Sequence, residues 1–544
     1  MKRVPAPRSH NERGLALIGV VGILLVLLVF AGGMVAQLAY ELNSVRTDTL
    51  SNRALAAADA GVHAMIEQIQ FNEAHNLPPP GPTPVTFTYP EPVGTPAATS
   101  YSSQIDNQWQ AGGINYYLIT STGTFNNVPF VFVKRKVRAI AKSVPISNWD
   151  SWSGSETNQF GNPVWYRSDT HYNGPVYSSG PMRIDYAGVT GVIPIFQDKV
   201  RTAISPVWND QADMGSPPSD SADWASIVAG GQNNFTIDKS PLALPAPKDN
   251  LFVMSQAWEG DGAKTAYPTV PNGIYMDGKD ATTQTATLTT GVYINTNGAT
   301  VTIDGSSSGS TETFTLQSKA FGGQYYQVTE NFTGLCTGST TVGLFSGKPP
   351  AGTFIRSGSF VGVPCGAPGP GVTNPGNGAI FVNGSIAFGS VSPNVSIKGS
   401  YAFVTPDYFP YNDSITLRGN FQYSDPTTDK VALWANKVLI ATASPSPMEI
   451  DASIIAGYPG EAPGNGYFAY LGCGSRTCGA NKGTLTVLGG VIENTRGAVG
   501  AWVGGVHTGY SRNIKFDSRF ATSPPPFNPM TGEYDLIAWE DLGT

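Results

Sequence analysis

The sequence offers few residues whose type and spacing suit catalysis. Gly305-Ser-Ser-Ser-Gly309 fits the GxSxG pattern of serine hydrolases. That pattern works on a strand-to-helix turn with a histidine partner, and this copy lies in a Ser/Gly-rich stretch with neither. HExxH, P-loop and paired CxxC motifs do not occur in the sequence. We therefore expect no enzymatic activity.

Metal-binding patterns are equally weak. The histidines are scattered along the chain: His10, His63, His75, His171 and His507. A polysaccharide lyase made of stacked β-strands would need clustered acidic calcium ligands. Its nearest counterparts, Asp277, Asp280 and Asp304, are too few and too irregularly spaced. The sequence predicts no metal site and no cofactor.

Three basic residues have positions that suit a polyanion. Lys398 and Arg418 each precede a glycine of a short repeat, and Arg356 lies two residues before a comparable glycine. If the repeats stack in register, these cations form a row that fits a phosphate backbone. Aromatic residues would add stacking surfaces for a single strand: Tyr325, Tyr326, Tyr401 and Phe421. The alternative is that exposed cations at these corners only prevent aggregation.

Four cysteines lie in the C-terminal half of the chain: Cys336, Cys365, Cys473 and Cys478. They follow the membrane-type segment described next, which would place them outside the cytoplasm, where disulfides form. Sequence order suggests Cys336–Cys365 and Cys473–Cys478, although four cysteines allow three connectivities. Zinc is the weaker alternative, because the spacings do not form CxxC pairs and no histidine is near.

The N-terminal part of the sequence predicts a long helix that begins with a membrane-type segment. Residues 15–36 carry no charge and are long enough to cross a bilayer, which takes roughly 20 residues. A basic segment precedes them and should stay in the cytoplasm: Lys2, Arg3, Arg8 and Arg13. The natural cleavage point, Gly14/Leu15, lies before the apolar run, so cleavage there would retain the helix.

This arrangement resembles the class III signal of type IV prepilins. The resemblance implies removal of residues 1–14 by a prepilin peptidase. Apolar residues continue at helical spacing from Leu38 to Ile69, and no proline occurs before Pro78. We expect one helix from about Leu15 to about Phe71, roughly 85 Å long. A plain single-pass anchor with a stalk is the alternative.

Gly19 stands at the fifth position after the cleavage point, where most pilins carry a glutamate. In that family the carboxylate neutralises the new α-amino group of a neighbouring subunit. A buried ammonium without a partner is costly. The resemblance therefore implies that this subunit caps the filament, because tip-located pilin-like proteins also lack the glutamate.

Three strand-like runs follow a proline-rich connector: residues 99–105, 114–125 and 128–142. Asn126-Asn127 predicts a hairpin turn between the last two. In the third run the apolar face should pack on the helix: Val131, Val133, Val137, Ala139 and Ala141. The opposite face is basic: Lys134, Lys136, Arg138 and Lys142. It suits anionic lipid, DNA or a neighbouring pilin, or it is only a solvated surface.

From about residue 145, short apolar runs recur after glycines. The clearest repeat is Gly384-Ser-Ile-Ala-Phe388, Gly399-Ser-Tyr-Ala-Phe403 and Gly419-Asn-Phe-Gln-Tyr423. Such spacing suits the coils of a β-solenoid. A β-sandwich is the alternative. Farther on, residues 513–527 leave the repeat, and the run 534–539 should return to the pilin sheet.

These features predict an α+β chain with a large all-β insertion. The expected segments are a leader (1–14), the membrane half of the helix (15–36), a pilin helix and sheet (15–145), a β-solenoid-like domain (146–510) and a C-terminal return (511–544). Losing the leader removes four basic side chains and one acidic one, so the net charge goes from −7 to −10. A broadly basic nucleic-acid-binding protein is excluded, and anion binding must be local.

The whole architecture resembles the ComZ family, large competence-associated pilins of thermophilic bacteria. The resemblance implies a minor pilin at the pilus tip that binds extracellular DNA for natural transformation. Its partners would be other major and minor pilins, the prepilin peptidase and, before assembly, the inner membrane. The bulk of the chain would be periplasmic or extracellular. An adhesin, or a subunit that primes assembly without binding DNA, is the alternative.

Overall fold

The computed structural model describes residues 11–543 apart from 75–76, 89–96, 128–130, 168–169, 187–194, 211–212, 215–216, 219–220, 239–241, 243–246, 260–265, 271–272, 277–278, 281–290, 309–310, 320–324, 334–337, 347–352, 362–377, 390–393, 398, 407–412, 424, 458–463 and 504. For 11–18 and the strands between 296 and 361 it gives the backbone alone. The chain forms two compact units. Unit 1 comprises Met1–Trp109, Tyr116–Lys142 and Tyr534–Thr544, and unit 2 comprises Gln110–Asn115 and Ser143–Glu533.

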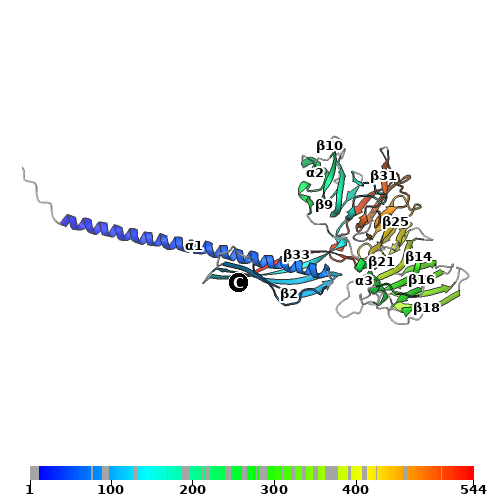
Figure 1. The fold of residues 1–544 in the computed structure, drawn as a ribbon, viewed down its shortest axis with the longest axis horizontal. Coiled ribbons are helices and arrows are strands. Elements are labelled where there is room, and N and C mark those ends of the chain that lie inside the picture. Colours follow the sequence, from blue (N-terminus) through cyan, green and yellow to red (C-terminus); the bar gives the residue numbers. More distant parts are fainter. Residues whose placement is uncertain are drawn as a thin grey trace, which may run out of the picture. The chain divides into compact units, whose positions relative to one another are not determined.

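Unit 1 is built on α1 (Asn11–Ala74), a single helix of 64 residues (Figure 1). Its apolar first half is exposed, and the second half buries one face: Leu50, Ala54, Ala57, Ala58, Val62, Met65, Ile66 and Ile69. Leu38, Leu42 and Val45 continue the same helical spacing but are exposed. Prolines follow Leu77 and prevent the helix from continuing. At this end of the helix, the side-chain Nδ2 of Asn72 donates to the carbonyl of Pro78 at 2.7 Å.

A five-stranded sheet covers the buried face of α1. Its order is β1 (Val85–Thr88), β2 (Ala97–Ala111), β3 (Ile114–Asn127), β4 (Val131–Pro145) and β33 (Met530–Gly543). β3 and β4 pair antiparallel, and Asn126 lies opposite Phe132. The predicted turn position was therefore wrong, since both asparagines belong to β3. The apolar face of β4 packs on the helix as expected, through Val137, Ala139 and Ala141.

The C-terminal strand β33 lies beside β4 at the edge of this sheet. The Tyr534 hydroxyl donates to Glu73 of α1, and Trp539 Nε1 donates to Asp59 Oδ1 at 3.2 Å. Arg135 and Asp541 form an ion pair between β4 and β33. Residues 511–533 belong to unit 2, so the return to the sheet begins later than position 511.

Two glycines allow the helix and the sheet of unit 1 to approach closely. A Cβ atom on Gly123 of β3 would lie 1.9 Å from the carbonyl oxygen of Ala54 and 2.4 Å from the amide nitrogen of Ala58. Both atoms belong to the backbone of α1 and cannot swing aside. Gly61 of α1 has similarly little room against Ser121. These contacts define how α1 is seated on the sheet.

Gly123→Ala should therefore destabilise unit 1 by about 1–3 kcal/mol, because the added methyl group must push the helix from the sheet. Hydrogen exchange of β3 and the second half of α1, in the full chain in detergent micelles, measures the loss. Gly81→Ala is the matched control, since no atom lies within 4 Å of its added Cβ. Equal protection in the two variants would contradict this account of the packing.

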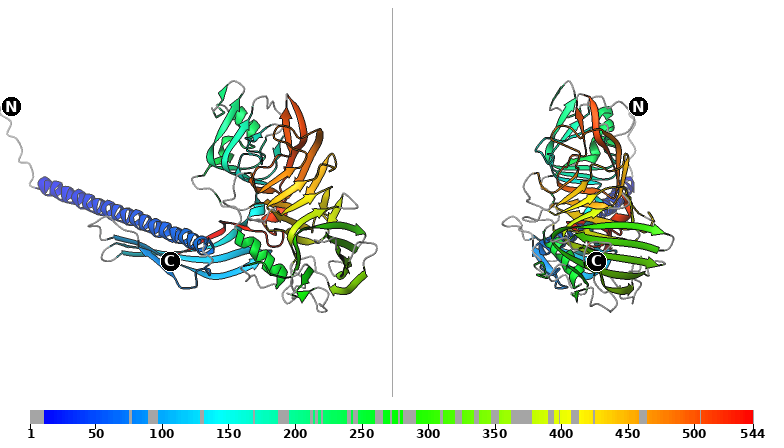
Figure 2. Two further views of the ribbon diagram at one scale, coloured as in Figure 1. Left: turned by 45° about the vertical axis from the view of Figure 1, so that its right-hand side comes forward. Right: turned by 90° about the vertical axis from the view of Figure 1, so that its right-hand side faces the viewer.

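Unit 2 consists largely of parallel strands stacked in three columns (Figure 2). The first column runs through β14 (Val292–Ser308), β19 (Ala379–Phe388), β21 (Ser400–Val404), β24 (Lys430–Ala435), β27 (Ser453–Ala456), β30 (Val491–Thr495), β5 (Ser151–Ser155), β8 (Val176–Asp185) and β9 (Val200–Asp210). The second includes β19, β22 (Ser414–Leu417), β25 (Lys437–Ile440) and β28 (Tyr467–Tyr470). The third includes β20 (Val395–Ile397), β23 (Phe421–Tyr423), β26 (Met448–Asp451), β29 (Asn481–Leu488), β32 (Val506–Lys515) and β7 (His171–Tyr172).

Apolar side chains from all three columns fill the space between them. Phe403 of the first column, Phe388 of the second and Phe421 of the third belong to one buried cluster. A second cluster covers the other face of the first column, where α3 (Pro247–Trp258) packs through Val253 and Met254. Parallel strands buried on both faces are the usual arrangement when helices or loops cover a sheet.

The glycine repeat marks successive strands within the stack, not successive turns. Gly384 lies in β19, Gly399 precedes β21 and Gly419 precedes β23, and these segments pair in different columns. Residues that stack are farther apart in sequence, for example Ile386 on Ile415 and Ile454 on Val491. The repeat length therefore corresponds to the distance along the chain from one column to the next within a turn. This corrects the assumption behind the predicted row of cations.

Unit 2 begins and ends in the middle of its own stack. Its first strand, β5, pairs in parallel with β30 from near its end, and β7 pairs with β32. In Figure 2 the cyan strands from the start of the unit lie beside orange and red strands from its end. We call this junction the seam. The strands from the start of the unit thus form one part of the stack. The strands from its end form the other part and pair with them at the seam.

A strap formed by residues 516–529 crosses several turns along one corner of unit 2. Phe516 lies against Gly174, Phe520 against Gly489, and Pro526 against Gly378. Each of these glycines leaves no room for a side chain beneath the strap. The Arg519 guanidinium lies 5.3 Å from the ring centre of Tyr423 and is held by Asp517. The Asp-x-Arg-Phe pattern in the sequence therefore marks this strap.

Candidate functional site

The exposed apolar half of α1 is the clearest functional surface of the described chain. Large apolar side chains from Val20 to Val45 are all more than half exposed. This helix, near the N-terminus, is long enough and apolar enough to cross a membrane once. An apolar surface of this extent is not stable in water and requires a bilayer or neighbouring protein.

The expected cleavage point lies within this helix. The backbone of Gly14 and Leu15 is helical in the uncleaved chain. Gly19 follows on the same helix, with no other atom within 4 Å of an added Cβ. No acidic residue lies between Leu15 and Tyr40. The described apolar half therefore contains no carboxylate that would neutralise a neighbour's amino group.

The basic face of β4 is exposed on unit 1. Lys134, Lys136 and Arg138 point away from the helix, opposite the buried apolar positions. Asp106 of β2 partly offsets their charge. Burial would raise the pKa of Asp106, but hydrogen bonds from Thr120 and Gln104 and the charges of Lys136 and Arg138 lower it below its ordinary value. This face is a weaker anion site than its sequence indicates.

Two of the three predicted DNA contacts, Arg356 and Arg418, do not lie on successive turns of the stack. Arg356 lies in β18 (Thr353–Val361), which pairs antiparallel with β17 (Gly338–Ser346) and not within the parallel columns. Arg418 is exposed directly after β22 of the second column, and its Nη1 donates to the carbonyl of Gly389 at 3.4 Å. Lys398 is outside the described residues. The stacking surfaces expected at Tyr401 and Phe421 are buried in the core.

The remaining sequence candidates carry no arrangement for chemistry. Residues 305–308 of the GxSxG stretch lie in β14, whose end pairs with β15 (Thr311–Lys319), so no strand-to-helix turn is present there. Cys473 and Cys478 are joined by a disulfide, in agreement with sequence order. Cys336 and Cys365 lie outside the described residues. No cluster that would hold a metal occurs among the described side chains.

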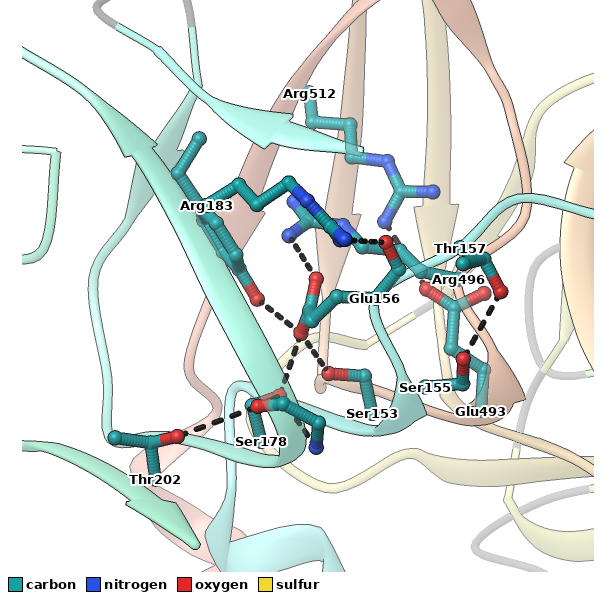
Figure 3. Close-up of polar contacts among 12 residues, drawn as sticks. Ser153, Ser155, Glu156, Thr157, Ser178, Arg183, Thr202, Glu493, Arg496 and Arg512 are labelled. Atoms are coloured by element: carbon teal, nitrogen blue, oxygen red, sulfur yellow. Dashed lines mark hydrogen bonds and ion pairs between the residues drawn. The ribbon is translucent and has the colours of Figure 1, made fainter. Parts of the chain in front are cut away.

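A buried charge network lies at the seam (Figure 3). Arg496, from the end of unit 2, is 2% exposed and pairs with Glu156, from its beginning, at 3.2 Å. The Arg496 guanidinium also donates to the Tyr172 hydroxyl and lies 3.7 Å from the ring centre of Tyr166. Glu156 accepts further hydrogen bonds from Ser153, Tyr166 and Ser178. A single carboxylate thus gathers donors from both sides of the seam.

A second ion pair in the network lies entirely in the last turn. Arg512 donates to Glu493 Oε1 at 3.2 Å, and the other oxygen of Glu493 accepts from the backbone of Phe468 and Gly497. Burial raises the pKa of Glu493, and Arg512 with these amides opposes that effect. Burial also raises the pKa of Tyr166 well above its ordinary value, so this tyrosine stays neutral and donates.

These charged groups are sealed from solvent: Glu156 is 1% exposed and Glu493 is not exposed at all. A substrate cannot reach them in this conformation, and their contacts join the two sides of the seam. Sequence reasoning missed it, because isolated charges are ordinarily assigned to the surface. The only sequence signal is the proximity of Glu493 and Arg496 within a glycine-rich apolar stretch.

No family model, curated protein or solved structure matches the chain. The functional argument must therefore rest on the residues themselves. Among the described residues, the strongest features are the exposed half of α1 and the β-rich unit carried by the same chain.

Proposed function

We propose that this chain is a type IV pilin-like subunit that binds extracellular DNA at the tip of a surface filament. The division of α1 supports this proposal best: an exposed apolar half continues into a half packed on a sheet. Such a helix suits a single membrane span before assembly. It equally suits packing among the helices of other pilins after assembly. The C-terminal strand β33 closes the sheet, so the large unit is an insertion.

Gly19 supports the tip position. A subunit without a carboxylate at this place has no counter-charge for the α-amino group of a subunit above it. An end subunit needs none. The tip also has room for a domain as large as unit 2, Gln110–Asn115 and Ser143–Glu533.

We interpret the parallel columns of unit 2 as a β-solenoid. Successive turns pair in parallel, whereas a sandwich built of hairpins would pair antiparallel. The assignment of DNA as the ligand rests on the resemblance to the ComZ family. An adhesin, or a subunit that only primes assembly, is the second candidate, and the net charge of −10 after leader removal favours it. Affinity of the full chain for DNA, measured against salt concentration, separates the two.

Gly14→Val should block leader removal in the source cells, because the resemblance places the peptidase cut immediately after this glycine. Intact-mass analysis should show residues 1–14 retained, and sheared filaments should lack the variant. Gly19→Val is the matched control, since a Cβ added at Gly19 meets no other atom within 4 Å. Normal processing of Gly14→Val, or wild-type chain that is never found in filaments, would contradict the pilin proposal.

A further inference from the structure

Three loops of unit 2 meet at one corner of the stack. The loop at 158–162 contacts the disulfide loop Cys473–Cys478, because Asn162 Nδ2 donates to the carbonyl of Ser475 at 2.8 Å. The disulfide loop contacts the hairpin formed by β31 (Gly500–Val503) and the start of β32 through a 3.1 Å bond from Cys478 N to Thr508 Oγ1. We call this surface the loop corner.

The loop corner is held in one shape by several constraints. The disulfide closes its central loop. In the hairpin, Trp502 pairs with His507, and their rings pack edge to face with centres 5.6 Å apart. Gly509 has a positive φ, and an added Cβ would lie 2.6 Å from that of Cys478. The groups presented here are therefore preorganised, which reduces the entropy lost when a ligand binds.

Large apolar side chains are unusually exposed at the loop corner. Trp502 is 45% exposed, and Val506 of the same hairpin is 64% exposed. Phe160 and Val503 are also exposed in these loops, and the exposed Leu471 lies two residues before Cys473. An exposed apolar patch on a soluble domain commonly marks a binding surface. Trp502 in particular offers an aromatic ring on which a nucleic acid base stacks.

Residues 462–516, which supply two of the three loops, are basic, whereas the whole chain carries a net charge of −7. Residues 462–516 contain a single acidic residue, Glu493, which is buried and paired with Arg512. The basic residues of this segment are Arg476, Lys482, Arg496, Arg512 and Lys515. Arg476 is exposed on the disulfide loop. Lys482 is half-buried, and its ammonium donates to the carbonyl of Ser444 at 2.8 Å.

We propose that the loop corner binds single-stranded DNA, with Arg476 and Lys482 near the phosphates and Trp502 stacked on a base. This proposal rests on the proposed function and names its contact site. A single strand is favoured over a duplex because only unstacked bases present a face to an aromatic side chain. The absence of exposed acidic residues from 462–516 favours a polyanion over a cationic or uncharged partner. The contacts replace the row expected at Arg356, Lys398 and Arg418.

The test uses the full chain in detergent micelles and a fluorescent 20-nucleotide poly-dT probe. Trp502→Ala should weaken binding about 5- to 150-fold, the range expected for one stacked base. Arg476→Gln with Lys482→Gln should reduce the slope of log K against log salt by about 1.4, because two phosphate contacts are lost. A duplex of the same length should bind more weakly than poly-dT.

Matched controls come from other surfaces of unit 2. Ile204→Ala changes an exposed apolar residue of β9, and Arg418→Gln removes an exposed cation; neither should alter affinity. Circular dichroism and an intact Cys473–Cys478 disulfide verify the fold of each variant. If wild type binds poly-dT and the corner variants bind equally well, the loop corner is the wrong site while DNA binding stands. If wild type binds neither probe at low salt, the corner proposal and DNA capture both fail.

Discussion

Arg496→Met is expected to destabilise unit 2 by about 3–5 kcal/mol, the usual result of leaving a buried charge without its partner. The guanidinium is the counter-charge of Glu156 at 3.2 Å and covers the ring of Tyr166 at 3.7 Å. Methionine fills similar space but leaves the carboxylate of Glu156 buried with only neutral donors. Thermal unfolding of the full chain, followed by hydrogen exchange in β5 and β30, locates the loss at the seam.

Arg167→Met is the control for this experiment. Arg167 pairs with Asp185 at 2.9 Å, but its side chain is 38% exposed. Water and salt screen such a pair, so its loss should cost no more than about 1 kcal/mol. The double variant Arg496→Met with Glu156→Gln should recover part of the stability, because it removes the unpaired charge. Equal effects of Arg496→Met and Arg167→Met would show that the seam does not depend on this ion pair.

A second large effect should come from Asp150, at the same junction. Burial raises the pKa of Asp150 to about 7, against hydrogen bonds from the backbone of Gly174 and Asn173 that lower it. Its ordinary pKa is near 3.8. The folded protein therefore binds this proton more tightly than the unfolded chain does. The burial of Asp150 therefore does not lower the free energy of unfolding below about pH 4. It lowers that free energy progressively between pH 4 and pH 7, and by its full amount above pH 7.

Asp150→Asn should remove that cost, since the amide stays neutral and still accepts from Gly174. Relative to wild type, the variant should gain about 1.4 kcal/mol per pH unit, or about 3 kcal/mol between pH 5 and pH 7. Thermal unfolding at both pH values measures the difference. Asp535→Asn, at an exposed position of β33, is the control. A pH-independent difference between wild type and Asp150→Asn would contradict the buried carboxylate account.

The seam gives these predictions a common basis. Backbone pairs between β5 and β30 and between β7 and β32 join segments that are separated by most of unit 2. The chain enters and leaves the unit near that junction: Ile146 N donates to the carbonyl of Pro529 at 2.8 Å. Thr531 Oγ1 donates to the carbonyl of Val144 at 3.1 Å. These hydrogen bonds hold the segment that enters unit 2 (144–146) against the segment that leaves it (529–531).

Local patterns in the sequence were sufficient for the elements of unit 1. Apolar residues at helical spacing predicted the buried side of α1 from Leu50 onward, and alternation in β4 predicted the side that packs on it. They were insufficient at Leu38 and Leu42, which continue the spacing but have no sheet beneath them. Apolar residues at helical spacing occur both in a helix that packs on a sheet and in a helix that packs in a membrane or against other subunits.

The sequence by itself predicted the long helix, the apolar half with no carboxylate and the strands of the first sheet other than β1, and it favoured the Cys473–Cys478 pair. Each depends on residues close in the chain, so periodicity and spacing reveal it. The tertiary structure alone decided which strands stack and where the seam lies. It also showed that Arg496 and Glu156 are buried and that three loops form one corner. Those features join residues hundreds of positions apart, and their pairing depends on the packing of complete turns, which no local pattern records.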